Sequence, residues 1–207
     1  AAPSAAPSAA GPSSSNGGVQ RIDVPASDLC VALRIDESGI VPGQPGVFAV
    51  DDLPANSLVT VYTYDRAVNE ATLQAMSEAR RNAVNRYAVQ GPEPDVTFIL
   101  DTPVDRRKHV GALFNEPAAG SAANMALNAD RVTLADGTVL YVLALYTCNQ
   151  PVSAGEELVW FYGHSYEAVR QKEQYEAGQA CTSKEPLQPS LDEVVQRIVT
   201  ARGDNVE

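Results

Sequence analysis

Residues 155–163, GEELVWFYG, carry the most information about how this chain folds. They follow Ser153 and Ala154 as a polar turn and then run into apolar and aromatic residues that end on Tyr162 and Gly163. Glycine and polar side chains are typical of turns, whereas valine, tryptophan and phenylalanine favour strands. We therefore expect a turn and then a short extended segment whose aromatic side chains pack into the protein.

Two upstream stretches have a similar mixture of turn and strand signals. Residues 46–49, GVFA, follow a turn rich in proline and glycine, and a glycine at the start of a strand lets another molecule approach the backbone closely. Residues 111–117, GALFNEP, place Asn115 after an apolar run and directly before Glu116 and a proline. An amide both donates and accepts hydrogen bonds, which suits a zwitterionic ligand. Taken alone, the two stretches also fit an ordinary strand start and a turn-capping asparagine.

In their order and spacing, the three stretches resemble signature segments of the SET-domain family of protein lysine methyltransferases. The first usually reads Gly-x-Gly followed by Leu/Val-Phe-Ala, and Gln44 stands here at its first glycine. The third usually reads Gly-Glu-Glu-Leu, two further residues and Asp-Tyr. Phe161 replaces that aspartate, and Tyr162 falls on the catalytic tyrosine.

The second segment usually reads Asn-His-Ser with another asparagine a few residues later. This chain keeps Asn115 and Asn124 but has Glu116 and Pro117 at the histidine and serine positions. The resemblance implies that Asn115 contacts the methyl donor S-adenosylmethionine. It also implies that Asn124 belongs to a threaded segment that packs the active site.

The family implies a complete set of site residues and no metal. Tyr162 is the expected catalytic residue. The residues expected to hold S-adenosylmethionine are Gly46, Val47, Phe48, Asn115 and Glu116. The residues expected to line a channel for the substrate lysine are Tyr146, Trp160 and Tyr166. The implied fold is α+β and mainly β, with several small sheets of short strands, a knot-like threaded C-terminal segment and a helical insert.

Composition and the resemblance together divide the chain into three parts. Residues 1–18 are rich in alanine, proline and serine without a charged side chain, which is typical of a flexible linker or tail. Residues 19–178 are the expected SET domain, with the helical insert at about 67–90. Residues 179–207 are the expected C-terminal extension, with a helix at about 191–201 that Ser190 and Glu193 begin as a capping box.

Hydrophobic periodicity predicts the elements between these limits. We expect one or two strands within 22–35 and further strands at 47–50, 57–64 and 96–100. Three- and four-residue apolar spacing predicts one amphipathic helix over 68–89, and a second helix is expected at 166–177. Asp136-Gly137 between two β-rich runs predicts a hairpin of 131–134 with 139–146.

Charge and cysteine content limit the partners. The net charge of −11 argues against nucleic acid as a direct partner, and it either attracts a basic protein or peptide or only keeps the protein soluble. No apolar run approaches the roughly 18 residues of a membrane span. The cysteines at 30, 148 and 181 are widely spaced, so we expect reduced, buried thiols without a zinc site. This predicts an intracellular protein, whether nuclear, cytoplasmic or organellar.

The sequence therefore predicts an S-adenosylmethionine-dependent lysine methyltransferase that acts on a basic protein or peptide. A histone tail and a non-histone protein are both open as substrates. The substitutions at Gln44, Glu116, Pro117 and Phe161 keep another interpretation open, a non-catalytic SET-like binding module.

Overall fold

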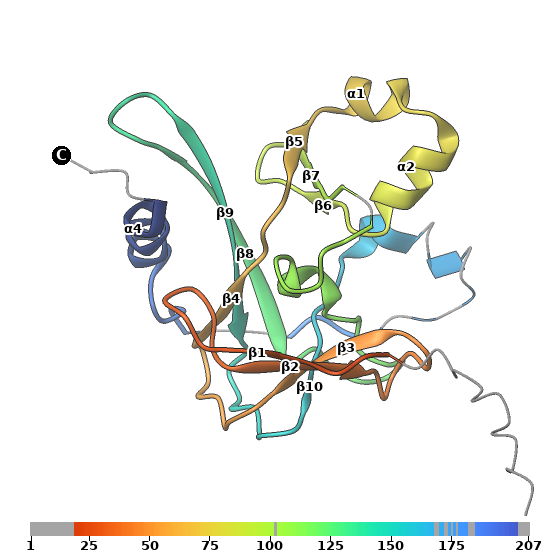
Figure 1. Ribbon diagram of the computed structural model, residues 1–207, viewed down its shortest axis with the longest axis vertical. Helices are drawn as coiled ribbons and strands as arrows, with labels where there is room; N and C mark the ends of the chain where they lie inside the picture. The colour runs from red at the N-terminus through yellow and green to blue at the C-terminus, as the bar shows by residue number, and fades with distance from the viewer. Residues whose placement is uncertain are drawn as a thin grey trace, which may run out of the picture.

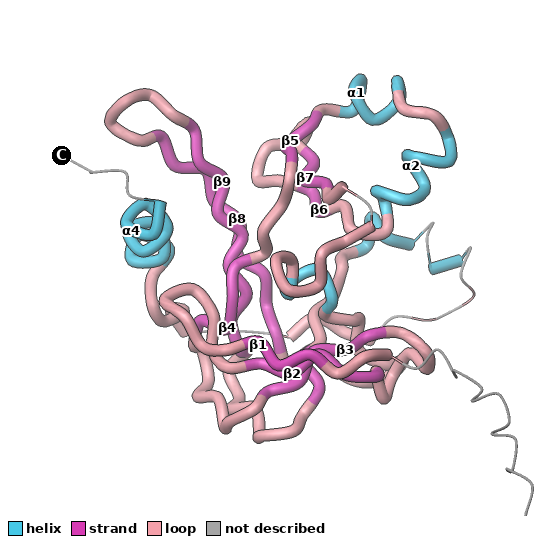
Figure 2. The backbone as a smooth tube through the Cα atoms, viewed as in Figure 1, coloured by secondary structure: helices cyan, strands magenta, loops and turns pink. Residues whose placement is uncertain are grey.

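The protein is built from three small antiparallel sheets with a few short helices, as Figures 1 and 2 show. The computed structural model describes residues 19–101, 103–167, 170, 171, 174, 176, 178–181 and 185–202. Within these residues, no helix has the length and apolar character needed to cross a membrane. The predicted class, α+β and mainly β, is confirmed. The predicted tail 1–18 lies outside the described residues.

The first sheet joins the two ends of the domain. Its strands, in the order in which they are hydrogen-bonded, are β1 (Ile22–Val24), β2 (Leu33–Glu37), β3 (Pro45–Ala49) and β10 (Glu157–Leu158). Strand β10 lies more than a hundred residues after β3, yet it pairs Leu158 with Val47 and Glu157 with Phe48. The pairing brings residues 155–163 to the strand that begins at residue 45.

The second sheet contains the longest strands. Its order is β4 (Leu58–Val61), β9 (Val139–Thr147) and β8 (Met125–Thr133). The predicted hairpin is confirmed, and Asp136 accepts a hydrogen bond from the Thr138 N–H at 2.8 Å in its turn. Strand β8 begins six residues earlier than the predicted 131. Its first residues, MALNAD, are alanine- and asparagine-rich and have weak strand propensity, so pairing with β9 decides their conformation.

The third sheet includes the segment that was predicted to be a helical insert. Its order is β5 (Arg66–Val68), β7 (Thr97–Ile99) and β6 (Val89–Gln90), and the helices α1 (Glu70–Ala75) and α2 (Glu78–Asn85) lie between β5 and β6 along the chain. The prediction of one helix over 68–89 is wrong. Met76 has extended backbone at ψ 150°, and the Ser77 hydroxyl accepts a hydrogen bond from the Arg80 N–H at 3.4 Å. Ser77 thus begins a second helix as its N-cap.

Helix α4 (Leu191–Arg202) covers one face of the second sheet (Figure 1). Its capping box is confirmed, since the Ser190 N–H donates to the Glu193 carboxylate at 2.9 Å and the Glu193 N–H donates to the Ser190 hydroxyl at 3.4 Å. The face of the sheet that α4 covers forms one core, and the opposite face contributes to the main core with the first sheet. The predicted helix 166–177 lies partly outside the described residues.

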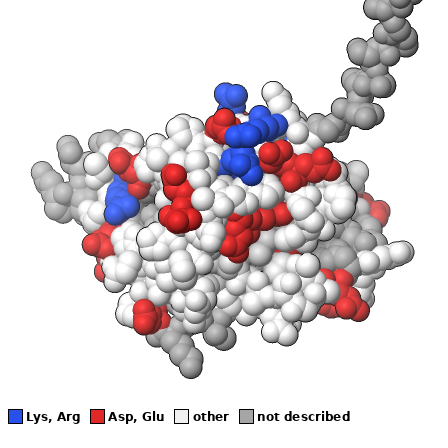
Figure 3. All heavy atoms as spheres, turned by 90° about the horizontal axis from the view of Figure 1, so that it is seen from below, with Lys and Arg blue, Asp and Glu red and all other residues white. Residues whose placement is uncertain are grey.

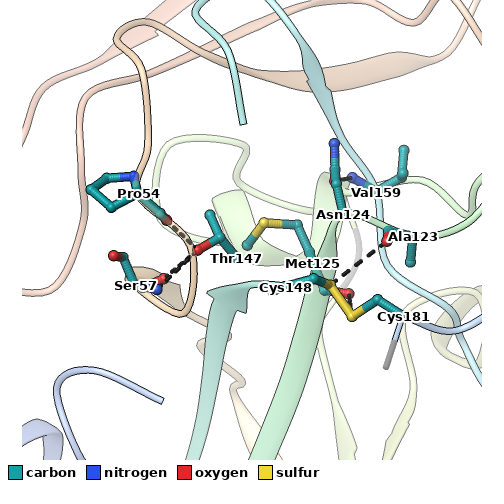
Figure 4. The surroundings of a disulfide bond; sticks show 9 residues. All are labelled: Pro54, Ser57, Ala123, Asn124, Met125, Thr147, Cys148, Val159 and Cys181. Carbon is teal, nitrogen blue, oxygen red and sulfur yellow. Dashed lines mark hydrogen bonds between the residues drawn. A yellow bond between two sulfur atoms is a disulfide. The ribbon is translucent and has the colours of Figure 1, made fainter. Parts of the chain in front are cut away.

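The cysteine prediction is wrong for two of the three residues. Cys148 and Cys181 form a disulfide with a Cα–Cα distance of 6.2 Å, and Cys30 remains a free thiol (Figure 4). Cys148 directly follows β9, while Cys181 ends a segment that lies against residues 117–123. The two cysteines are 33 residues apart in sequence, so only the fold brings them together. Disulfides are typical of oxidising compartments, and the prediction of an intracellular location loses the support it drew from reduced thiols.

Candidate functional site

The three sequence stretches meet at one place in the fold. After β10, Val159 bridges to Asn115, and the Trp160 N–H donates to the Asn115 carbonyl at 3.1 Å. Because β10 also pairs with β3, the segment 157–160 lies between the strand start at Gly46 and the turn at Asn115. The structure therefore brings residues 46–48, 115–116 and 157–162 together.

A carboxylate network joins these stretches. The Glu157 side chain accepts hydrogen bonds from the Ser38 hydroxyl at 2.7 Å, the Gly39 N–H at 2.9 Å and the Asn115 amide at 3.1 Å. The same amide donates to the Pro45 carbonyl at 3.0 Å. A Cβ at residue 46 would lie 2.4 Å from Glu157 Oε1, so only glycine leaves room for this carboxylate.

Asn124 fixes strand β10 through hydrogen bonds to its backbone. Its side-chain oxygen accepts the Val159 N–H at 2.8 Å, and its amide donates to the Glu157 carbonyl at 2.9 Å (Figure 4 shows Asn124 beside Val159). One asparagine thus satisfies backbone groups on both sides of Leu158. This use of both a donor and an acceptor explains why an amide side chain occupies the position.

Tyr162 is held at both its main chain and its hydroxyl. Its hydroxyl donates to the Phe114 carbonyl at 2.7 Å, and its N–H donates to Glu116 Oε1 at 2.9 Å. The ring is half-buried, and its centroid lies 5.2 Å from that of Trp160 and 4.9 Å from that of Tyr166. These two aromatic neighbours leave the tyrosine little freedom to rotate.

Glu116 has a role that the sequence did not predict. It is only 5% exposed and forms a buried ion pair with Arg170, which is 2% exposed. The Arg170 Nε–H donates to Glu116 Oε2 at 2.8 Å, and Nη2 donates both to Glu116 Oε1 and to the Gly163 carbonyl at 2.8 Å. Both carboxylate oxygens are therefore occupied by protein groups, and the prediction that Glu116 contacts a cofactor is not supported by its geometry.

A cavity of about 570 Å³ opens beside Tyr162. Six aromatic residues line it: Tyr62, Tyr87, Phe114, Trp160, Tyr162 and Tyr166. Among the described residues around the cavity, Arg86 alone carries a charge. The Tyr62 hydroxyl donates to the Tyr87 carbonyl at 2.6 Å, and burial raises the pKa of Tyr62 well above its usual value, so this phenol stays neutral.

Of the three predicted channel residues, Trp160 and Tyr166 line this cavity and Tyr146 does not. Tyr146 is fully buried in the core between the second sheet and α4. Its prediction as a channel residue is wrong because strand β9 directs it to the opposite face of the sheet.

Four residues of the site were absent from the sequence predictions: Tyr62, Tyr87, Phe114 and Arg170. Phe114 precedes Asn115 and had a local signal, because it belongs to the quoted stretch 111–117. Tyr62 and Tyr87 come from a strand extension and from the insert, and nothing local in the sequence links either to residue 162.

Comparisons with known proteins include a likeness to a solved structure. No protein-family model matches the chain, and no curated protein matches it. A solved structure from Plasmodium falciparum, named as a "putative histone methyltransferase", matches with a TM-score of 0.43 and 19% identity over 65% of this chain and 96% of that one.

Proposed function

We propose that this protein transfers a methyl group from S-adenosylmethionine to a lysine side chain of a basic protein or peptide. The observation that carries the proposal is the position of Tyr162. It projects into an aromatic cavity and is bonded to Phe114 and Glu116, directly beside Asn115 and the start of β3. The resemblance of residues 46–49, 115–124 and 155–163 to SET-domain segments gives this arrangement its chemical meaning.

The residues near Gly46 fit the donor in part. The Asn115 amide nitrogen is already bonded, whereas none of the described hydrogen bonds involves its Oδ1 atom. That oxygen is a suitable acceptor for the ammonium of the donor's methionine end. The main chain of β3 at Gly46, Val47 and Phe48 would contact the rest of the donor. Glu116 is excluded from this set, because Arg170 and Tyr162 occupy its oxygens.

When bound, S-adenosylmethionine supplies an electrophilic methyl group on a positively charged sulfonium. The chain's own contribution is to bind and orient a neutral amine. The aromatic cavity removes water from the amine, which lowers the pKa of the amine. The Tyr162 hydroxyl donates a hydrogen bond to the Phe114 carbonyl, and a hydroxyl oxygen that donates in this way can also accept an N–H from the amine. Alignment of this kind supplies much of the rate enhancement.

The surface charge supports a basic partner. The net charge is −11, and on the face in Figure 3 acidic side chains are spread among uncharged ones, while basic side chains gather near the upper edge and at the left. A negative potential raises the association rate of a basic protein or peptide and disfavours nucleic acid. A histone tail and a non-histone basic segment meet this criterion equally.

Two observations favour a second candidate, a non-catalytic module that binds a lysine-containing peptide. The Glu116 carboxylate takes part in an ion pair where the family has a histidine, and Gln44 replaces the first glycine of the donor segment. A module of this kind would keep the aromatic cavity without using the donor. It predicts peptide binding in the absence of S-adenosylmethionine affinity.

Calorimetry and label transfer separate the two candidates. Titration of S-adenosylmethionine into the protein is expected to release or absorb heat with one-site stoichiometry. Methyl-labelled donor and a cell lysate are then expected to yield labelled proteins whose modified lysines mass spectrometry locates. Peptide binding without donor heat or label would contradict the enzyme and support the module.

A further inference from the structure

Arg170 contacts several residues around Tyr162. Besides its bonds to Glu116 and the Gly163 carbonyl, its guanidinium donates to the Glu167 carboxylate at 3.3 Å. The guanidinium carbon lies 5.2 Å from the Phe161 ring centroid and 5.7 Å from that of Tyr166. Arg170 thus contacts the residues on both sides of Tyr162 without lining the cavity itself.

Stability alone does not explain this ion pair. Removing two charges from water costs free energy, and a buried ion pair is often no more stabilising than apolar residues of the same volume. The other arginine ion pairs of the described residues are partly or largely exposed and avoid this cost. This ion pair is buried despite the cost, and its hydrogen bonds hold the backbone of residues 162 and 163. Its burial is better explained by the backbone geometry that it fixes there.

We propose that the Glu116–Arg170 ion pair is the positioning element of Tyr162. The inference rests on the proposed function, because Tyr162 is the residue that would touch the reacting amine. Arg170 is a positioning residue, since it acts through Glu116 and Gly163 and does not reach the cavity. Glu116 of this pair stands at the position where SET-domain proteins have a histidine. The ion pair thus gives this chain a different means of fixing the position of Tyr162.

The positioning acts through three fixed points. Glu116 Oε1 holds the Tyr162 N–H, Arg170 holds the next carbonyl at Gly163, and the Phe114 carbonyl holds the hydroxyl. Gly163 has a φ of 91°, a conformation that residues with a side chain rarely adopt, and this conformation sets the direction of the chain directly after Tyr162. With both its main chain and its hydroxyl fixed, the tyrosine oxygen has one position relative to the amine.

Arginine is required for this geometry. Its planar fork donates two parallel bonds to one carboxylate and a further bond to the Gly163 carbonyl, and it stacks on Phe161 and Tyr166. A lysine at residue 170 keeps the positive charge but lacks the fork. Arg170→Lys is therefore the variant that tests position while retaining the charge pair.

Trp160 provides a readout that does not depend on activity. It is the only tryptophan of the chain, and its ring centroid lies 5.2 Å from that of Tyr162. The experiment measures the emission maximum of Trp160 and its quenching by acrylamide in three variants of the full chain. Arg170→Lys and Glu116→Gln disturb the pair, while Val194→Ala removes buried volume under α4, away from the cavity, and controls for a general loss of stability.

We expect a red shift and stronger quenching in both ion-pair variants and neither in Val194→Ala. In label-transfer assays, we expect Arg170→Lys to lower kcat by about tenfold or more while the KM for peptide changes little, because a small misplacement lowers the rate more than the binding. Trp160 emission like that of the wild type in both ion-pair variants would overturn the inference, as would an unchanged kcat. If the wild type transfers no methyl group, the proposed function fails, and Trp160 emission and quenching still decide whether the pair positions residues 160–162.

Discussion

The sequence predicts Tyr162 as the catalytic residue and Tyr146 as a residue of the substrate channel, and the structure places them in two different environments. Tyr162 is half-buried beside the cavity, and its hydroxyl donates to the Phe114 carbonyl. Tyr146 is 0% exposed under α4, and within the described part of the chain its hydroxyl has no hydrogen-bond partner. Tyr162 lies beside the cavity with its hydroxyl held by a hydrogen bond, whereas Tyr146 contributes mainly its ring to the core.

The register of β9 explains the difference. Residue 145 pairs with Leu127, which lines the cavity, and residue 146 pairs with Ala126. Side chains alternate between the faces of a strand, so Leu145 faces the main core and Tyr146 faces α4. Because β9 is buried on both faces, its sequence lacks the polar–apolar alternation that would reveal the register.

Reduction of the disulfide is expected to have the largest effect, because the Cys148–Cys181 bond joins these two regions. Cys148 follows β9 near Tyr146, and Cys181 ends the segment that follows the cavity residue Tyr166 and the positioning residue Arg170. For a separation of 33 residues, the chain-entropy model gives about 3–4 kcal/mol of stabilisation. Thermal unfolding with and without a reductant, and of Cys148→Ser, measures this loss.

Cys30→Ser is the matched control, since Cys30 forms no disulfide. It should respond to the reductant as strongly as the wild type does. Equal melting temperatures of oxidised and reduced wild type would contradict the prediction and show that the noncovalent contacts of residues 178–181 hold the segment without the bond.

Tyr162→Phe tests the cavity side of the comparison. The variant removes the hydroxyl oxygen that would accept an N–H from the amine but keeps the ring and its contacts with Trp160 and Tyr166. We expect methyl transfer to fall about 100-fold, which corresponds to about 2.7 kcal/mol of transition-state stabilisation. Initial rates with labelled donor and a substrate peptide measure it, and calorimetry is expected to find donor binding nearly unchanged. A rate within a factor of two of the wild type would remove Tyr162 from the mechanism.

Gly46→Ala tests the start of β3, where the protein would contact S-adenosylmethionine. The added Cβ lies 2.4 Å from Glu157 Oε1, so the carboxylate must move and lose bonds from Ser38 and Asn115. We expect a loss of about 1–3 kcal/mol in the free energy of unfolding and weaker donor binding. Denaturant unfolding and calorimetry measure the two effects.

Gly39→Ala is the control for this change, because its Cβ would meet Glu157 Oε2 at an ordinary 3.7 Å. Its stability should stay within about 0.5 kcal/mol of the wild type. If both alanine variants behave alike, the close packing at Gly46 has no energetic consequence.

The sequence predicted those parts of the site whose signals are local. Gly46, Asn115 and Tyr162 stand within short stretches of recognisable order, and strand pairing brings these stretches together. Arg170 could not be predicted, because its partner Glu116 is 54 residues away and a single arginine in a helical pattern normally faces solvent.

Other features of the fold depend on similar long-range choices. The disulfide needed the three-dimensional positions of Cys148 and Cys181, and the break in the insert at Ser77 followed from one N-cap within an otherwise continuous helical pattern. By contrast, the Asp136-Gly137 turn and the capping box of α4 are chemistry between near neighbours, and both were predicted. Interactions between near neighbours can be predicted from the sequence. The face of a strand on which a side chain lies, and its partners far along the chain, cannot.

Tyr146→Phe has the smallest expected effect and tests the other side of the comparison. Removing a buried hydroxyl without a partner should leave the free energy of unfolding unchanged or raise it by about 1 kcal/mol, because no bond is lost and a desolvation cost disappears. Methyl transfer should not change, in contrast to Tyr162→Phe. Chemical denaturation and the label-transfer assay measure both quantities.

The pH dependence of this variant gives an independent check. Burial raises the pKa of Tyr146 to about 12, above the value of about 10 in an unfolded chain. Between these values the unfolded state loses the phenol proton and the folded state keeps it, so this tyrosine lowers stability as pH rises above about 10. The stability advantage of Tyr146→Phe over the wild type should therefore grow from pH 10 to pH 12. An advantage that stays constant over this range would show that the hydroxyl reaches water in solution, and the contrast with Tyr162 would then lie in ring packing alone.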